Sequence, residues 1–226
     1  MLFDPQSIQL TSNGRPVRLH LFSTGRIASR LSNKWEPIWV LVIDHPEGIF
    51  LVDTGIRTHI TPWYYNILYK FDLDRDQEID RQLANINIET RQVKTVILTH
   101  RHFDHTGGLG YFPQTPIAPT DFDDTCGPFT KAHYLTKTKD LAIVPTPGHT
   151  RDHCSVLLKT DTRHILFAGD TTENRKTAKT YVTIKAYAQI HPLTILLTHD
   201  PGAGQKLKAL ESQPSSKTGN PPPPHP

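Results

Sequence analysis

Four side chains of the kinds that bind divalent metals lie within six consecutive positions of the chain. They are His100, His102, Asp104 and His105, in the string His-Arg-His-Phe-Asp-His. Imidazole nitrogen and carboxylate oxygen are ligands that a borderline ion such as zinc accepts. A single histidine near a strand end is usually an ordinary polar surface residue, but a fold without a metal gains nothing from crowding four such groups together. The spacing therefore predicts a metal site.

Three further candidate ligands each follow or end a β-prone apolar run. His149 comes after the run 141–144, Asp170 ends the run 164–170, and His199 comes after the run 193–197. Ligands of open sheets gather at strand ends, so these loops are expected to reach one crevice. Together the seven groups exceed what one tetrahedral zinc needs. They divide naturally between two ions, with one carboxylate bridging.

The elements that must position these groups are read from the apolar patterns. Strands are predicted at 15–22, 38–43, 49–52, 96–98, 141–144, 154–158, 164–170 and 193–197, and helices at 62–70, 74–89 and 181–190. Residues 111–140 are rich in proline and receive no firm assignment. Asp53, at the end of the strand 49–52, has two open interpretations: it caps a helix, or it holds a ligand histidine by the ring nitrogen turned away from the metal.

Composition limits the class of protein. A chain of 226 residues with 36% hydrophobic and 21% charged residues suits one larger α/β domain. We assign this domain to residues 1–212 and a proline-rich, disordered tail to 213–226. A net charge of +3 is too small to indicate nucleic acid, and no apolar run predicts a membrane span or a secretory signal. With only two cysteines, Cys126 and Cys154, a cytoplasmic location is expected.

From Asp53 to His199 these motifs, in this order, resemble the metallo-β-lactamase superfamily. The resemblance implies an α/β (α+β) fold, the αββα sandwich, in which two mixed sheets pack face to face with helices outside. It implies that His100, His102 and His149 bind one metal, that Asp104, His105 and His199 bind a second, and that Asp170 bridges them. Asp104 would also be the catalytic carboxylate that moves a proton, and Asp53 would hold a ligand histidine.

Within the superfamily, residues 146–150, 167–170 and 198–201 are most similar to the N-acyl-homoserine lactone hydrolases, the quorum-quenching lactonases. This similarity implies two Zn²⁺ ions per chain, with Fe, Mn or Co as other divalent metals, and a metal-bridging hydroxide that opens a small-molecule lactone or related ester. Those lactonases carry a tyrosine three positions after the bridging aspartate, where this chain has Glu173. Glu173 and His153 are therefore the candidate substrate contacts.

Several alternatives remain open at this stage. A hydroxyacylglutathione hydrolase-like thioesterase should need a longer region after His199, and a nuclease should need a basic arm. An iron-dependent sulfur dioxygenase would use the same fold with one iron, and a metal-binding scaffold would show no turnover. The aromatic stretch 63–65 suits either the surface of a homodimer or a wall of the substrate cleft.

Overall fold

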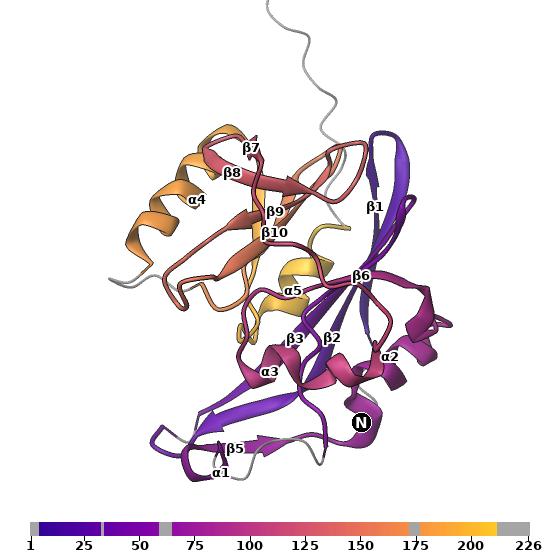
Figure 1. Cartoon of the computed structure of the whole chain (residues 1–226), viewed down its shortest axis with the longest axis vertical. Coiled ribbons are helices and arrows are strands. Elements are labelled where there is room, and N and C mark those ends of the chain that lie inside the picture. The colour runs from indigo at the N-terminus through magenta and orange to yellow at the C-terminus, as the bar shows by residue number, and fades with distance from the viewer. Residues whose placement is uncertain (1–4, 33, 59–64, 172–176, 212–226) are drawn as a thin grey trace, which may run out of the picture.

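A computed structural model describes residues 5–32, 34–58, 65–171 and 177–211 (Figure 1). The predicted tail at 213–226 lies outside these residues. In the part of the chain that is described, no helix is both long and apolar enough to cross a membrane.

Two mixed sheets form the body of the protein. The first has the order β1-β2-β3-β4-β6, with β5 pairing beside β2, and only its β4–β6 pair is parallel. Its strands are β1 (Gln6–Ser12), β2 (Arg15–Ser29), β3 (Trp35–His45), β4 (Gly48–Val52), β5 (Tyr69–Asp72) and β6 (Val93–Ile97).

The second sheet has the order β12-β11-β10-β9-β8-β7, and only its β11–β12 pair is parallel. Its strands are β7 (Asp124–Cys126), β8 (Phe129–Tyr134), β9 (Leu141–Pro145), β10 (Cys154–Lys159), β11 (His164–Phe167) and β12 (Leu193–Leu196).

The helices are short apart from one. They are α1 (Tyr65–Leu68), α2 (Ile79–Asn85), α3 (Phe103–Thr106), α4 (Ala178–Ile190) and α5 (Ala203–Lys208), and 3₁₀ turns cover Arg75–Gln77, Thr90–Gln92 and Gly107–Tyr111.

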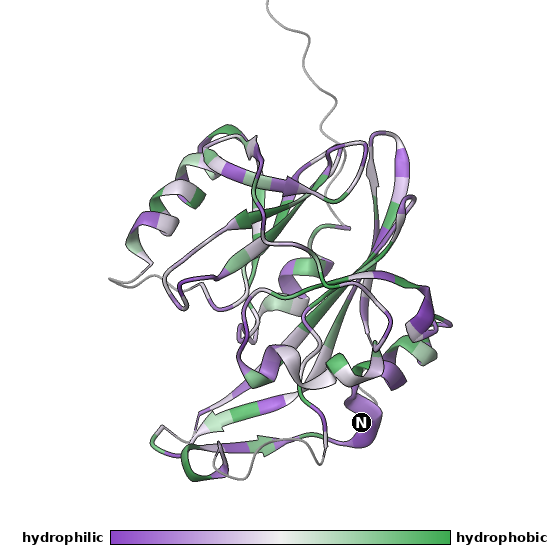
Figure 2. Ribbon diagram, in the orientation of Figure 1, coloured by the Kyte–Doolittle hydropathy of each residue, from purple (hydrophilic) through white to green (hydrophobic). Residues whose placement is uncertain are grey.

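The main core lies between the two sheets. Side chains alternate along a strand, so Leu19 and Leu21 of β2 point into this core, where they join Ile143 of β9 and Val156 of β10. Figure 2 shows hydrophobic residues concentrated in these central strands. The opposite face of each sheet is covered by a helix.

On the outer face of the first sheet, Ile79 and Leu83 of α2 pack with Val40 and Val42 of β3. On the outer face of the second sheet, Ile184 and Tyr187 of α4 pack with residues of β10 and β11 (Figure 1). The expected αββα sandwich of two mixed sheets is therefore confirmed.

One edge of the sandwich is closed by α5, which contacts β1 and β12 and adds Ala203 and Leu207 to the main core. At another edge, residues 116–118 bond to the backbone of Val96 in β6. Ala118 then packs against the same core. The edges of the first sheet are thus paired or covered, which limits association through free strand edges.

Two element predictions were wrong in part. Tyr69 and Lys70 were expected in a helix, but they begin β5, where Tyr69 pairs with Ser29 of β2. The helix predicted across 74–89 is shorter, because residues 75–77 form a 3₁₀ turn and α2 ends at Asn85. β1, β7 and β8 were not predicted at all. Pairing with the distant strand β2 overrides the local pattern at β5, whereas β1 and β7 form hairpins with the strands that directly follow them.

Candidate metal centre

Four loops bring the seven predicted ligands to one edge of the sandwich. His100, His102, Asp104 and His105 follow β6 of the first sheet, with the last two on the short helix α3, whereas His149, Asp170 and His199 follow β9, β11 and β12 of the second sheet. The groups form two clusters, His100/His102/His149/Asp170 and Asp104/His105/His199, each of which could hold a metal ion. Every cluster combines ligands from both sheets.

In the first cluster three ring nitrogens converge. Nδ1 of His102 lies 2.9 Å from Nε2 of His100 and 3.0 Å from Nε2 of His149. Nδ1 carries either one proton or one lone pair, so it cannot make two good hydrogen bonds at once. A cation bound by all three lone pairs would remove this conflict, because zinc binds imidazole nitrogen at about 2.0–2.1 Å.

Two buried atoms that face each other across the two clusters have no hydrogen-bond partner among the described residues. Nε2 of His105 and Oδ1 of Asp170 approach to 3.3 Å, and neither has a hydrogen-bond partner among the described residues. Oδ2 of Asp104 lies 3.2 Å from Nε2 of His199. Buried polar atoms without partners cost free energy, and a bound divalent cation would satisfy both Nε2 of His105 and Oδ1 of Asp170. The donor set therefore fits a metal.

Asp170 stands between the clusters. Its Oδ2 lies 3.3 Å from Nε2 of His149, and its Oδ1 lies 3.3 Å from Nε2 of His105. One carboxylate thus presents one oxygen to each group of ligands.

The second cluster is held from behind by hydrogen bonds to the ring nitrogens that face away from it. Nδ1 of His105 bonds to Oδ2 of Asp53 at 2.7 Å, and Nδ1 of His199 donates to the carbonyl of Pro37 at 2.9 Å. Asp53 is itself fixed by the backbone N–H and the hydroxyl of Thr99. Residues 53–57 are not helical, so the interpretation of Asp53 as a helix cap was wrong.

Two histidines beside the carboxylates, His105 and His199, have raised pKa values. Burial opposes protonation of His199, yet Asp104 and Asp170 outweigh it and raise its pKa to about 10. Burial likewise opposes protonation of His105, but Asp53 and Asp104 raise its pKa well above the ordinary value. A metal ion would replace these protons as the positive charge beside the carboxylates.

The two candidate substrate contacts have different outcomes. His153 is 1% exposed, its Nδ1 lies 2.9 Å from Oγ1 of Thr146, and its Nε2 accepts the backbone N–H of Asp170 at 3.2 Å. With both nitrogens occupied inside the protein, His153 does not face a substrate. Burial and the neighbouring histidines lower its pKa to about 4, against the opposing charge of Asp170. Glu173 lies outside the described residues.

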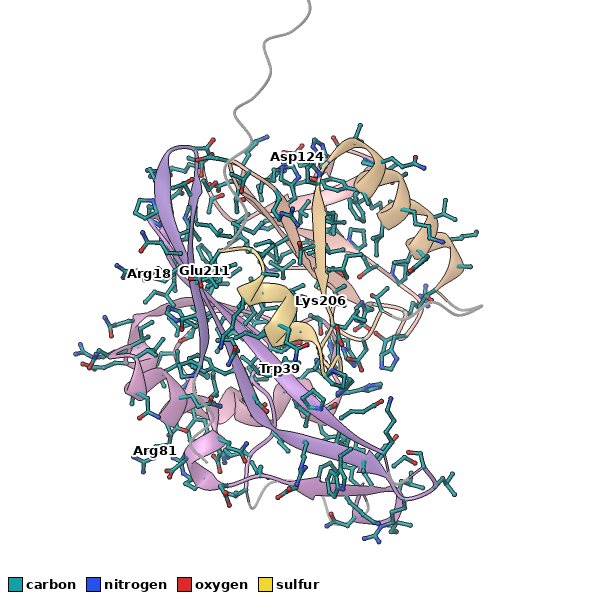
Figure 3. The ribbon with its side chains drawn as sticks, turned by 180° about the vertical axis from the view of Figure 1, so that it is seen from behind. Arg18, Trp39, Arg81, Asp124, Lys206 and Glu211 are labelled. Atoms are coloured by element: carbon teal, nitrogen blue, oxygen red, sulfur yellow. The ribbon has the colours of Figure 1, made fainter. Side chains whose placement is uncertain are left out.

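A cleft runs past the clusters on both sides of Glu36. Cavities of about 300 and 530 Å³ share four lining residues, Glu36, His149, Asp170 and His199. The smaller cavity has hydrophobic and aromatic lining residues, namely Ile27, Tyr65, Tyr69 and Phe103, and polar ones that include Ser29, Ser32 and Lys34. The larger is lined by Leu197, Asp200 and Lys206, and Figure 3 shows Lys206 on α5 with Trp39 nearby on β3.

Sequence reasoning missed Glu36 and the place of Tyr69 and Phe103 in the cleft wall, whereas Tyr65 belongs to the stretch for which such a wall was one of two interpretations. Tyr69 was expected on a helix, and Glu36 fell just outside the predicted strand 38–43. Only the pairing of β2 with β3 and β5 brings these residues to the cleft.

This fold and these clusters define the class of protein. A sequence profile described as the metallo-beta-lactamase superfamily matches residues 33–125. The chain thus contains a metallo-beta-lactamase domain, as the order of its motifs implied, and it is a metal-dependent hydrolase.

Two relatives and one solved structure are similar to this chain. N-acyl homoserine lactonase AttM of Rhizobium radiobacter is 25% identical, across 85% of this chain and 96% of the relative. A hydroxyacylglutathione hydrolase of Idiomarina loihiensis is 23% identical, across 59% of this chain and 46% of the relative. The fold also matches a solved N-acyl homoserine lactone hydrolase with the product N-hexanoyl-L-homoserine at its catalytic metal center, with a TM-score of 0.66 and 17% identity over 88% of this chain and 96% of that one.

Proposed function

We propose that this chain is a dinuclear zinc hydrolase that opens an N-acyl lactone or a related ester. The observation that carries the proposal is the position of Asp170, whose two oxygens each lie 3.3 Å from a ring nitrogen of a different cluster. A carboxylate placed in this way suits a bridge between two ions. A site for one tetrahedral ion would need no such bridge.

The proposed ligands follow the two clusters. His100, His102 and His149 would hold one ion, Asp104, His105 and His199 would hold the other, and Asp170 would touch both. Zinc is proposed because neutral imidazoles and carboxylates suit it, while Fe, Mn and Co accept the same donors.

When bound, two divalent ions would lower the pKa of a shared water and polarise the carbonyl of the substrate. Asp104 lines the smaller cavity and is nearly buried, and His105 and His199 lower its pKa against the effect of burial, so it is ionised. It can orient the attacking water and accept its proton. The water oxygen bonds to the carbonyl carbon, the ring C–O bond breaks, and the proton passes from Asp104 to the leaving oxygen.

The substrate class rests on the smaller cavity and on the relatives. The side chains of Tyr65, Tyr69 and Phe103 line this cavity beside the carboxylates, and their rings lie 4.1–6.2 Å from one another in the two pairs that involve Phe103. An apolar wall next to a polar centre suits a substrate with an acyl chain. The names of the relatives, N-acyl homoserine lactonases, support the same class.

The test combines metal analysis with a substrate panel. We expect two Zn²⁺ per chain, hydrolysis of N-acyl homoserine lactones, loss of this activity after chelation, and recovery on adding Zn²⁺. Undiminished hydrolysis by metal-free protein would contradict the proposal. A single bound iron with oxygen uptake would favour the sulfur dioxygenase instead.

A thioesterase of the hydroxyacylglutathione type is the second candidate, because one of the relatives carries that name. The panel should therefore include S-lactoylglutathione, and faster cleavage of this thioester than of any lactone would select the thioesterase. A cytoplasmic location stays part of the proposal; both cysteines are free thiols in the structure, and a reducing compartment maintains such thiols.

A further inference from the structure

His153 lies directly behind the clusters, although it belongs to neither. Its ring packs against that of His100, with ring centroids 5.2 Å apart. Nε2 accepts the backbone N–H of Asp170, and Nδ1 contacts the hydroxyl of Thr146. The Thr146 hydroxyl in turn lies 2.7 Å from Oγ of Ser155, and all these residues except Asp170 are at most 2% exposed.

These contacts fix the tautomer of His153. A backbone N–H can only donate, so Nε2 must carry a lone pair and the ring proton must be on Nδ1. Nδ1–H then donates to Oγ1 of Thr146, whose own proton is free to reach Ser155. The opposite tautomer would set two N–H groups against each other at Asp170. The hydroxyl of Thr146 can accept from Nδ1–H in this tautomer and pass its own proton to Ser155, which leaves Nε2 as the acceptor for Asp170.

The backbone just before Asp170 is tightly packed against the same ring. Gly169 has a φ of 52°, and a Cβ built there would lie 2.8 Å from Nε2 of His153 and 2.9 Å from Thr99. The chain can hold this left-handed conformation and close approach because the residue is glycine. The position of Asp170 is thus set by its main chain, from behind, before any ligand binds.

We propose that His153 is a positioning residue that acts through Asp170, its Nε2 fixing the backbone of the carboxylate that faces both clusters. The inference rests on the proposed metal pair, and it assigns to His153 a role in metal affinity instead of substrate contact. Partners that orient a metal ligand typically contribute about 10–100-fold to metal affinity or activity.

Two substitutions distinguish the effect of losing the Nε2 acceptor from the effect of losing the imidazole ring. His153→Gln places an amide oxygen near the position of Nε2, so Asp170 keeps its acceptor. His153→Asn places its amide near Nδ1, so the contact with Thr146 survives while the acceptor for Asp170 is lost. We expect H153N to bind Co²⁺ about 10–100-fold more weakly than the wild type, with an altered visible absorption spectrum. H153Q should bind nearly as the wild type does.

A matched control is His45→Gln at the other end of the sandwich. His45 is also buried, accepts a backbone N–H, that of Glu47, and bonds through Nε2 to a carboxylate, that of Asp140. H45Q should lower the melting temperature without changing Co²⁺ affinity. This control separates loss of stability from loss of metal affinity.

Equal Co²⁺ affinity in H153N and the wild type would overturn the inference, and so would equal losses in H153N and H153Q, which would mean that only ring volume matters. If H153N does not fold, Thr146→Val serves in its place, because it keeps the ring but removes the hydroxyl that accepts from Nδ1–H and holds the ring in position. T146V should also bind Co²⁺ more weakly, and unchanged binding would overturn the inference.

Metal titration also separates this inference from the proposed function. Wild-type protein that binds two Co²⁺ but opens no lactone refutes the proposed substrate and leaves the comparison of H153N with H153Q intact. If the wild type hydrolyses lactones but H153N binds Co²⁺ as tightly as the wild type does, only the inference about His153 is refuted.

Discussion

Two buried groups of histidine and carboxylate occupy different places in this molecule, and they differ in whether their atoms are satisfied. In the group formed by His45 and Asp140, at the end of the sandwich away from the metal centre, Asp140 is 2% exposed and both of its oxygens accept hydrogen bonds. The donors to Asp140 are Ser12, Asn13, His45, Thr136 and Thr138, at 2.6–3.1 Å. At the metal centre Oδ1 of Asp170 and Nε2 of His105 have no such partner within the described chain.

The difference shows how the same residue types serve two purposes. A carboxylate whose lone pairs are all met by protein donors joins distant segments and leaves nothing for a ligand. A carboxylate surrounded by ring nitrogens, which offer lone pairs of their own, is incomplete without a cation. The test of this distinction is to alter each region and measure both stability and metal binding.

The largest expected effect comes from Asp170→Asn. The amide removes the charge shared by both clusters and turns an N–H group toward one of them. We expect metal affinity and hydrolysis to fall by at least about 100-fold, the upper end of what loss of a supporting partner costs. Metal content after dialysis and kcat/KM measure the effect, and a variant that retains two ions and full activity would remove Asp170 from the centre.

Asp140→Asn should produce the opposite pattern. Its amide would face buried donors, so the free energy of unfolding should fall by about 3 kcal/mol, as when one partner of a buried polar pair is lost. Urea unfolding of metal-free protein measures this loss. Metal stoichiometry of the folded variant should stay that of the wild type, and a change in stoichiometry would show that the two regions are coupled.

Asp53→Asn is expected to have an intermediate effect, because Asp53 touches a ligand without being one. Loss of its charge weakens the hold on His105 and should lower metal affinity by about 10–100-fold. A Co²⁺ titration measures the change. Unaltered affinity would mean that Thr99, which contacts both side chains, orients His105 sufficiently by itself.

The smallest expected effect is a difference in acid stability. Hydrogen bonds from Ser12, Thr136 and Thr138 hold the pKa of Asp140 far below its ordinary value, despite the opposing effect of burial. A lowered carboxyl pKa stabilises the fold above the unfolded pKa of about 3.9, and this contribution is lost as pH falls through the folded pKa.

For a single carboxyl group of this kind the loss between pH 7 and pH 3 is about 1 kcal/mol. The wild type should therefore lose about that much more free energy of unfolding than D140N over this interval. Parallel slopes for the two proteins would show that Asp140 does not titrate differently on folding.

The candidate metal ligands could be picked out from the sequence because each lies at the end of a short apolar strand or within a few residues after it. Strand ends of a layered α/β fold meet at shared edges, so His149, Asp170 and His199 could be grouped without coordinates. Asp140 could not be singled out in the same way. It stands in a polar turn after Lys139 and reads as solvated, and its donors come from segments as distant as Ser12.

The interior position of His153 was also hidden in the sequence. It follows Arg151 and Asp152, both exposed, in a segment that reads as a surface loop. Only the antiparallel pairing of β9 with β10 turns His153 inward toward Thr146. The place of Tyr69 in the cleft wall was missed for a related reason, since β5 reaches the cleft by pairing with a strand some forty residues earlier, with Arg26 opposite Asp72.

Each cluster takes ligands from both sheets, as in the pairing of His102 with His149, and this has a consequence for folding. An ion held there would cross-link the two layers of the sandwich, since neither layer alone provides enough donors. Binding to the folded form only adds free energy of unfolding, about 2.7 kcal/mol at a free metal concentration 100 times Kd. Metal supply would then govern the lifetime of the folded protein as well as its catalytic activity. In a chain without metal, the two sheets would begin to separate at this edge.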